Sequence, residues 1–400
     1  MNGRISTGML YQQSLTSMLA KQAKLAHTQQ QLSTGQKLIS AKDDPVAAGL
    51  AVGLDRSLAE LERYGQNANI LQNRLGLQEN ALARVGDAMA RVNELTIQAS
   101  NPAMGPDSRK AISTELEAIH AGLIDLANST DGSGRYLFGG TADGDAPFSI
   151  GTGGVVYSGD QTQRRVELAP DTFVSDTLPG SEIFLRLRTG DGRVHASALP
   201  GNTGTGLLMD YSLTDPAAFD GGTYQVRFPT PDTYEVRNSA NVVVGTGSFE
   251  DGESIAFAGL QIKLDGAPAA GDAFEIGPAG VRDVFGTIQG LIDTLESNPV
   301  TAGERTAMQN ALQGALRDVS LASGRMIDAR AAGGAQLRAL DQAADLREAN
   351  SITVKDALSG LRDLDWAEAI SRYNQETTAL QAAQTVFTQM QSMSLFNMMR

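Results

Sequence analysis

The 400-residue sequence has no cysteine, one tryptophan and three histidines. Without cysteine the chain can form neither a disulfide nor a thiolate nucleophile, and it cannot offer sulfur to a metal. His27, His120 and His195 lie in three differently patterned segments with no carboxylate at metal-ligand spacing, so we expect each imidazole to be solvated or packed. The common nucleophile, phosphate-binding and zinc signatures, G-x-S-x-G, G-x-x-x-x-G-K and H-E-x-x-H, are also missing. The sequence therefore predicts no enzyme activity, no cofactor and no metal site.

Two acidic clusters are the remaining candidates for a cation site or for paired carboxylates. Asp143 and Asp145 form the first, and Glu250, Asp251 and Glu253 form the second. Each cluster lies beside glycine, a combination typical of turns, in which the carboxylate accepts hydrogen bonds from nearby backbone N–H groups. We expect turns rather than calcium sites at both.

Positive charge is scarce in the middle of the chain. The sequence has 32 basic and 46 acidic side chains and a net charge of −14. Residues 137–281 hold 8 basic and 19 acidic side chains, whereas residues 1–136 hold 13 of each and residues 282–400 hold 11 and 14. Such a chain has no basic field to attract phosphates, which argues against nucleic acid and an anionic membrane surface as partners. The sequence also lacks a secretory signal peptide and an apolar run of membrane-spanning length, so we expect no membrane insertion and, if the protein is exported, an unusual route.

The acidic middle segment is also rich in turn residues, with 23 of the 43 glycines and 9 of the 13 prolines. Between its Asp-Gly and Gly-Gly turn signals lie short β-prone runs, at 155–157, 165–168, 183–187, 224–228, 234–236, 241–244 and 260–264. Short strands separated by such turns are typical of many-stranded β domains. Residues 137–281 are therefore predicted to be an inserted all-β domain.

The longest regular pattern runs through residues 41–101. Alternating steps of four and three residues give this seam: Leu50, Leu54, Ser57, Leu61, Tyr64, Ala68, Leu71, Leu75, Gln78, Leu82, Val85, Met89, Val92, Thr96 and Ala99. A 3.5-residue repeat of mostly apolar positions predicts a long helix whose seam is covered by other helices. Asp44 and Pro45 are suited to the N-cap and first position, and the pair Asn101-Pro102 to the end.

Helical periodicity also covers the rest of both flanks. It runs over residues 108–128 and 281–297, and restarts at Thr301 with Glu304 at capping-box spacing. The predicted fold is a multidomain α+β protein, in which a long antiparallel α-helical bundle or coiled coil from both chain ends carries the inserted β domain. Its predicted parts are an N-terminal assembly helix (1–40), the two halves of a helical rod (41–136 and 282–363), the β domain (137–281) and a C-terminal assembly helix (364–400).

The two terminal helices have one-sided seams. Tyr11, Met18, Leu25 and Leu32 fall seven apart with Leu15, Gln22 and Gln29 between them, and Trp366, Tyr373, Leu380 and Phe387 alternate with Ile370, Thr377 and Gln384. The first 42 residues contain no acidic side chain, and beyond Glu376 the only charge is Arg400. Because such a helix buries little apolar surface alone, we expect the two ends to pair and other subunits to supply further cover. The candidate subunit-interface residues are Tyr11, Leu15, Met18, Leu25, Leu32, Trp366, Ile370, Tyr373, Leu380, Phe387, Leu395 and Phe396.

Several motifs resemble the flagellin family of bacterial flagellar axial proteins. Residues 32–49, LSTGQKLISAKDDPVAAG, are similar to the flagellin-type N-terminal signature. RISTGM at 4–9, GRYLFGGT at 134–141, APF at 146–148, and YSGD at 157–160 with Arg164 and Arg165 are closer to its hook-associated protein 3, or hook-filament junction, branch. SLFN at 394–397 also resembles this branch, although the ending MMR at 398–400 departs from its aromatic terminus.

The resemblance implies a structural subunit of the flagellum that lies between hook-associated protein 1 and the flagellin filament. It also implies contact with further copies of the chain, type III export with an uncleaved N-terminus, an export chaperone on the C-terminal helix, and a secreted, extracellular location at the hook-filament junction. Two alternatives stay open on the sequence: a flagellin-type filament subunit, and a secreted adhesin or hydrolase that displays the β domain on a shaft.

Overall fold

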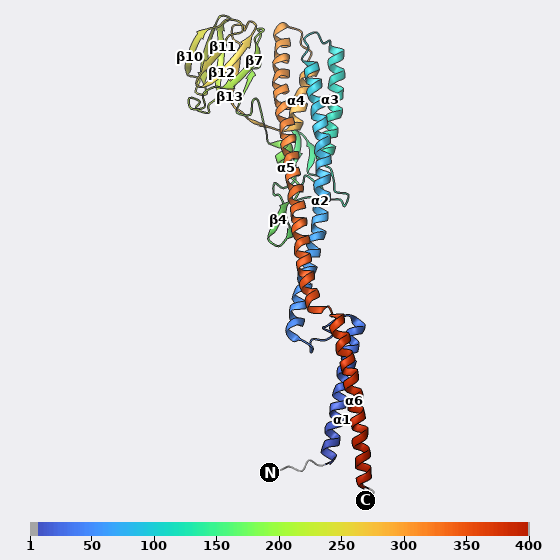
Figure 1. The fold of residues 1–400 in the computed structure, drawn as a ribbon. Coiled ribbons are helices and arrows are strands. Elements are labelled where there is room, and N and C mark those ends of the chain that lie inside the picture. The colour runs from blue at the N-terminus through green and yellow to red at the C-terminus, as the bar shows by residue number, and fades with distance from the viewer. Residues whose placement is uncertain (1–6, 399–400) are drawn as a thin grey trace. The chain divides into compact units, whose positions relative to one another are not determined.

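The computed structural model describes residues 7–398, with side chains at residue 9 and over residues 11–389. The helices are α1 (Thr7–Thr34), α2 (Pro45–Ala99), α3 (Pro106–Ala127), a short helical turn η1 (Ser181–Leu185), α4 (Val284–Glu296), α5 (Ala302–Arg362) and α6 (Trp366–Met398) (Figure 1). The described residues form two compact units. The terminal unit comprises residues up to 66 and from 343 onward, and the central unit comprises residues 67–342. The long helices α2 and α5 contribute to both.

The fourteen strands within residues 7–398 all lie in the central unit. They are β1 (Phe148–Gly151), β2 (Gly154–Tyr157), β3 (Arg165–Ala169), β4 (Thr172–Ser175), β5 (Leu187–Arg188), β6 (Val194–Ala198), β7 (Leu207–Leu213), β8 (Tyr224–Thr230), β9 (Thr233–Asn238), β10 (Val243–Ser248), β11 (Ser254–Phe257), β12 (Leu260–Asp265), β13 (Ala273–Pro278) and β14 (Val281–Arg282). All pairings are antiparallel. The helical flanks and the central β region confirm the predicted fold class.

Helix ends follow the local signals in the sequence. The Asp44 carboxylate accepts hydrogen bonds from the N–H groups of Val46 and Ala47 at 3.0 and 2.9 Å, and α2 begins at Pro45. Thr301 and Glu304 form the predicted capping box, with reciprocal hydrogen bonds of 3.2 and 2.9 Å. Gly35 ends α1 in the left-handed region at φ +67°, where its N–H donates to the carbonyl of Gln31. Local side-chain chemistry is sufficient to place these ends.

The predicted seam of α2 is buried along most of its length. Every seam position from Leu61 to Ala99 is buried, whereas Leu50 is 57% exposed and Ser57 is also exposed. The two polar members of the buried part have partners: Gln78 exchanges two hydrogen bonds with the backbone of Leu178, and Thr96 donates to the carbonyl of Val92. Polar groups at these positions are therefore compatible with a dry seam.

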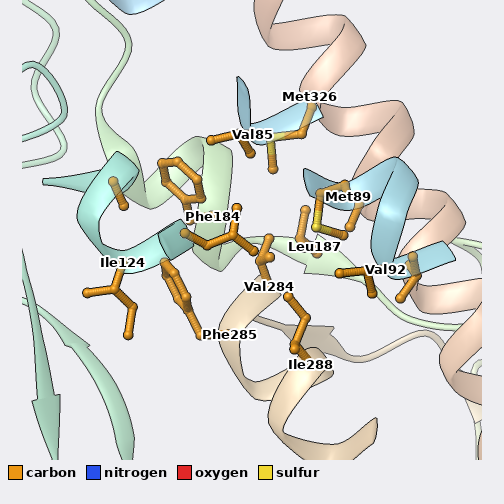
Figure 2. Packing of buried hydrophobic residues seen from close by; sticks show 14 of the residues in the cluster. Val85, Met89, Val92, Ile124, Phe184, Leu187, Val284, Phe285, Ile288 and Met326 are labelled. Atoms are coloured by element: carbon orange, nitrogen blue, oxygen red, sulfur yellow. The ribbon is translucent and has the colours of Figure 1, made fainter. Parts of the chain in front are cut away.

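Four helices share one apolar core in the central unit (Figure 2). Val85, Met89 and Val92 of α2 meet residues of α3, α4 and α5, as shown by Ile124, Ile288 and Met326 in the same cluster. Phe184 and Phe285 add stacked rings with centroids 5.8 Å apart. The α2 seam is covered here on several sides, which is the cover that its repeat requires.

The β region divides between two cores. The side chains of Phe138, Phe148, Ile183, Phe184 and Leu187 belong to the helical core, and β2 packs against it, so the hairpin β1–β2 lies on the helices. A second core, from Val194 to Ile276, lies between a five-stranded sheet of order β10-β9-β8-β13-β6 and a three-stranded sheet of order β11-β12-β7. Only this second part is a β-sandwich.

The predicted strand at 183–187 is wrong. Ser181–Leu185 is the helical turn η1, with only Leu187 and Arg188 extended in β5. Ile183 and Phe184 are fully buried in the helical core. The branched and aromatic residues of this run are there because the segment is buried, and such residues can be buried in a helix as well as in a strand. The predicted helix start at 281 is also too early, because Val281 and Arg282 form β14 and Asp283 caps α4.

The sandwich is attached to α5 by polar side chains. Asn310 accepts a hydrogen bond from the N–H of Leu208 at 2.7 Å, and Arg317 donates to the carbonyl of Met209 at 2.6 Å. The buried Asp318 carboxylate accepts from the N–H of Gly190 and from Arg282. One face of α5 therefore orients the β-sandwich within the central unit.

Asp143 lies in a buried ion-pair cluster, so its prediction as a turn residue is wrong. Arg74 of α2 is 5% exposed and contacts Asp131 at 2.8 Å and Asp176 at 3.1 Å, and Arg164 contacts Asp143 at 3.0 Å. Asp143 is also 3.9 Å from Arg74. The cluster connects α2 to two segments that follow α3. Asp251 fits the turn prediction, because its carboxylate accepts from the N–H of Gly266.

Candidate subunit interface

The terminal helices α1 and α6 lie side by side in the terminal unit (Figure 1). Contacts at Tyr11 with Phe387, Thr28 with Glu376, and Gln36 with Asp363 show that the helices are antiparallel. The Tyr11 and Phe387 ring centroids are 5.1 Å apart and the rings are tilted by 39°. The expected pairing of the two chain ends is present in the structure.

The contact face of each helix keeps most of the predicted positions that fall seven apart, but most of the intervening positions differ from the prediction. Buried and half-buried positions in α1 include Met18, Lys21, Leu25, Thr28 and Leu32, whereas Gln22 and Gln29 are exposed. In α6 they include Ala369, Tyr373, Glu376, Leu380, Ala383 and Phe387, whereas Ile370 and Gln384 are exposed. The predicted intervening positions Gln22, Gln29, Ile370 and Gln384 are therefore wrong as seam positions.

A buried hydrogen bond explains the choice of edge. The Thr28 hydroxyl, in a side chain that is 3% exposed, donates to the Glu376 carboxylate at 2.8 Å. This bond requires residues 28 and 376 to face each other. Each lies one position before a predicted seam position, Gln29 and Thr377. Ala369 is then buried and Ala383 half-buried, and the larger Ile370 is exposed.

The structure divides the candidate interface residues into three groups. Leu15, Met18, Leu25, Leu32, Tyr373, Leu380 and Phe387 are half-buried. Tyr11, Trp366 and Ile370 stay 46%, 53% and 50% exposed. Leu395 and Phe396 lie outside the described side chains. The first group is partly buried within the α1–α6 pair, and the second keeps about half of its surface exposed.

Sequence reasoning missed three exposed apolar side chains on the same helices. Met9, Leu19 and Val386 are each more than half exposed, and none of them lies on the predicted repeat. The sequence signal for these residues is a large apolar side chain outside the seven-residue repeat, on a helix with few charges. The predicted seam gives such a side chain no partner within the helix pair. Together with Tyr11, Trp366 and Ile370 they form what we call the outer apolar set.

The joint next to this pair is held by backbone hydrogen bonds. Lys37 N–H donates to the carbonyl of Arg362 at 2.7 Å, and Leu364 N–H donates to the carbonyl of Gly35 at 3.1 Å. The Trp366 ring lies against Gly35, where an added Cβ would be 3.5 Å from Cζ2. The signature segment 32–49 therefore contains the end of α1, a turn bonded to the α5–α6 connection, and the start of α2. Asp43 and Asp44 accept hydrogen bonds from backbone N–H groups in this segment.

A second uncovered apolar surface lies at the start of α2. A cleft of about 570 Å³ is lined by Gly49, Leu50, Gly53, Leu54 and Ser57 of α2 and by Ala357 and Leu361 of α5. Arg362 contacts Asp55 beside it, with Nη1 at 3.0 Å from the carboxylate. The first three positions of the predicted α2 seam thus face an open cleft, unlike the positions after them.

Metal-binding geometry is not found among the described residues. No group of three or more His, Asp or Glu side chains between residues 7 and 398 is arranged to hold a metal. His27 is 3.6 Å from a single carboxylate, Asp43, and burial lowers the pKa of His120 and of His195. None of the described helices is long and apolar enough to cross a membrane.

Three family models match the chain. The bacterial flagellin N-terminal helical region matches residues 5–143, and the bacterial flagellin C-terminal helical region matches residues 319–399. Between them, the flagellar hook-associated protein 1, D2-like domain, matches residues 199–278, which lie within the β-sandwich.

Relatives and solved structures from two flagellar classes are similar to this chain. Flagellar hook-associated protein 3 of Salmonella typhimurium is 28% identical over 397 residues, which is 99% of this chain and 100% of that protein. The crystal structure of Xanthomonas campestris FlgL is 56% identical with a TM-score of 0.73, and the match covers 76% of this chain and 99% of that chain. Polar flagellin C of Vibrio parahaemolyticus is 35% identical over 130 residues only, which is 32% of this chain and 33% of that flagellin.

Proposed function

Because the chain belongs to the FlgL family of flagellar hook-associated proteins 3, we propose that it is the structural subunit that joins a layer of hook-associated protein 1 to the flagellin filament. The observation that carries the mechanism is the outer apolar set on α1 and α6. These six large side chains stay 46% to 65% exposed, although the pair is already formed.

The outer apolar set supports contact with neighbouring subunits. Exposed apolar groups that gather on one element mark interaction sites, because their burial removes apolar surface from water. The helices that carry the set are also poor in charge, with no acidic residue before Asp43 and no charged residue between Glu376 and Arg400. Little charge must therefore be desolvated when another helix covers them.

Likeness to flagellin at both ends supports a junction role. The regions that match the flagellin models include α1 and α6, so the chain offers a filament-type surface to flagellin and to copies of itself. The β-sandwich, which resembles a domain of hook-associated protein 1, lies outside those regions. We therefore assign the axial contacts to the helices and regard the β-sandwich, from β6 to β13, as a separate, displayed domain.

The proposal includes a route and a location. The relatives are flagellar proteins, and the chain is accordingly an extracellular flagellar component. We infer type III export with the N-terminus retained, and an export chaperone that holds the C-terminal helix until assembly. The outer apolar set supports the inference of a chaperone, because apolar side chains that are exposed before assembly promote aggregation.

The test compares two double substitutions in α6. Ile370→Ser with Val386→Ser removes two outward-facing groups, and Leu380→Ser with Phe387→Ser removes two that contact α1. We expect the first variant to keep the monomer's thermal midpoint but to release flagellin into the medium instead of retaining filaments on cells. The second should lower the midpoint. Gln381→Ser with Thr378→Ser, at exposed polar positions, is the matched control.

Two results would contradict the proposal. Normal filament retention by the exported Ile370→Ser/Val386→Ser variant would remove the outer apolar set from assembly. Retention of filaments by a strain that lacks the chain altogether would remove the junction role itself.

A further inference from the structure

A cleft of about 390 Å³ lies in the central unit where α3 begins and α4 ends. It is lined by Pro106, Asp107, Arg109 and Lys110 on one side and by Leu295, Glu296, Ser297 and Asn298 on the other. The outer apolar set and the proposed junction contacts lie on other helices. The cleft is therefore independent of the proposed function.

Arg109 is a buried cation without a counter-charge. Its side chain lines the cleft and the residue is only 9% exposed. Nη1 donates to the carbonyl of Met104 at 3.0 Å, but Nε–H is buried with no acceptor. Among residues 9 and 11–389, no carboxylate lies within 4.0 Å of its guanidinium. A buried charge in this state is strongly unfavourable unless an anion compensates it.

The first turn of α3 adds a second attraction for an anion. The N-cap residue is Gly105, which makes no side-chain cap, and Pro106 follows it at the start of this 22-residue helix. The N–H groups of the first turn and the helix dipole both favour negative charge at this end. A negative group in the cleft would thus meet the helix end and Arg109 together.

The charges at the rim limit the kind of anion. Lys110 is exposed and adds a positive charge, while Asp107 and Glu296 are exposed and add two negative charges. Glu296 already accepts a hydrogen bond from the Ser113 hydroxyl at 3.2 Å. A dianion such as phosphate would be repelled by these two carboxylates, whereas a singly charged group matches the one uncompensated cation.

We propose that this cleft binds a carboxylate group, with Arg109 as its counter-charge, the α3 N-terminus as hydrogen-bond donor, and Lys110 and Asn298 at the rim. The group comes either from a free carboxylate or from an Asp or Glu side chain of another subunit. The two sources share the same chemistry at Arg109 and differ in whether assembly depends on the cleft.

The first test is titration of the full chain with acetate, followed by the Arg Nε–H resonances in a ¹⁵N NMR spectrum. We expect a saturable shift of the Arg109 resonance, assigned by its loss in Arg109→Gln. Arg109→Gln should also weaken acetate binding, measured by thermal stabilisation, by about tenfold or more. Arg305→Gln, at an exposed arginine of α5, is the matched control and should leave the titration unchanged.

Glu296→Gln separates an external carboxylate from an internal one. If an external group compensates Arg109, this variant removes a competing negative charge and should bind acetate more tightly, by a few-fold. If Glu296 itself turns to Arg109 in solution, the variant should lower the thermal midpoint in acetate-free buffer, which would overturn the proposal. A linear, non-saturable acetate response of the Arg109 resonance would overturn it as well.

Filament retention by the Arg109→Gln strain then identifies the source. Lost retention, with acetate binding also lost in the purified variant, assigns the carboxylate to a neighbouring subunit. Normal retention with the same loss of acetate binding assigns it to a free carboxylate.

Discussion

The α2 seam between Ala68 and Ala99 and the α1–α6 pair follow the same seven-residue repeat, but only the first is buried throughout. The α2 seam has neighbours in α3, α4, α5 and the loops after α3, and each of its positions is inaccessible to water. The α1–α6 pair offers each helix one partner, so its seam residues are half-buried and its outer apolar set is open. A repeat predicts that one face of a helix is apolar and packs against other elements. The number of neighbouring elements decides how much of that face is buried.

The largest effect should follow from breaking the ion-pair cluster on α2. Arg74→Met leaves Asp131 and Asp176 without their buried partner, so we expect a loss of about 3–5 kcal/mol in the free energy of unfolding. Urea denaturation of the full chain, monitored by circular dichroism, measures it. Arg84→Met, at an exposed position of the same helix, should change the free energy by less than about 0.5 kcal/mol. Equal losses in the two variants would show that the cluster contributes nothing specific.

Truncating one seam side chain in each region compares their packing directly. Met89→Ala opens a cavity in the four-helix core and should lower the free energy of unfolding by about 2–5 kcal/mol. Leu380→Ala in α6 removes a half-buried group and should lower it by only about 1 kcal/mol. Differential scanning calorimetry can resolve the two units if they melt separately. A larger loss at Leu380 than at Met89 would mean that the terminal pair is the better packed region.

Acid should weaken the central unit through Asp131. Burial raises the pKa of Asp131, but hydrogen bonds from Ser133, the N–H of Arg135 and Arg74 outweigh it and lower the pKa from 3.8 to about 2. A lowered folded-state pKa stabilises the fold at pH values above 3.8, and this contribution disappears as the pH falls through about 2.

The matched variant for this effect is Asp131→Asn. We expect the difference in thermal midpoint between wild type and variant to be constant from pH 7 to about pH 5 and to shrink between about pH 4 and pH 2. A difference that stays constant down to pH 2 would contradict the lowered pKa.

The smallest effect concerns the register of the terminal pair. Thr28→Val keeps the shape of the side chain but removes the hydrogen bond to Glu376, so we expect a loss of about 1 kcal/mol in the terminal unit. Gln29→Leu, at the neighbouring position that the repeat favours, should be neutral because Gln29 is exposed. Thermal unfolding of both variants distinguishes the registers. A larger change in stability for Gln29→Leu than for Thr28→Val would instead support the predicted seam through Gln22 and Gln29.

Local signals in the sequence were sufficient for the helix ends and for much of the β region. Asp44 with Pro45 and Thr301 with Glu304 act over three or four residues, and each pair starts a helix where predicted. The predicted strand at 183–187 is wrong because burial, rather than strand pairing, explains the apolar composition of this run. For the terminal helices, the sequence predicted their pairing but not the exposed residues Met9, Leu19 and Val386, since no period marks a residue that faces solvent.

The sequence by itself determined the helical flanks, the inserted β region, the positions of the α2 seam and the family. These follow from composition, period and capping, which depend on neighbours in the chain. The tertiary structure decided which edge of the terminal seams is buried, which core receives Ile183 and Phe184, and how Asp143 is paired. Each of these depends on contacts between distant residues: Thr28 meets Glu376 across 348 positions, and Arg74 meets Asp176 across 102. A repeat has two possible edges of nearly equal apolarity, and only the shape and hydrogen-bonding groups of the partner make one of them lower in free energy.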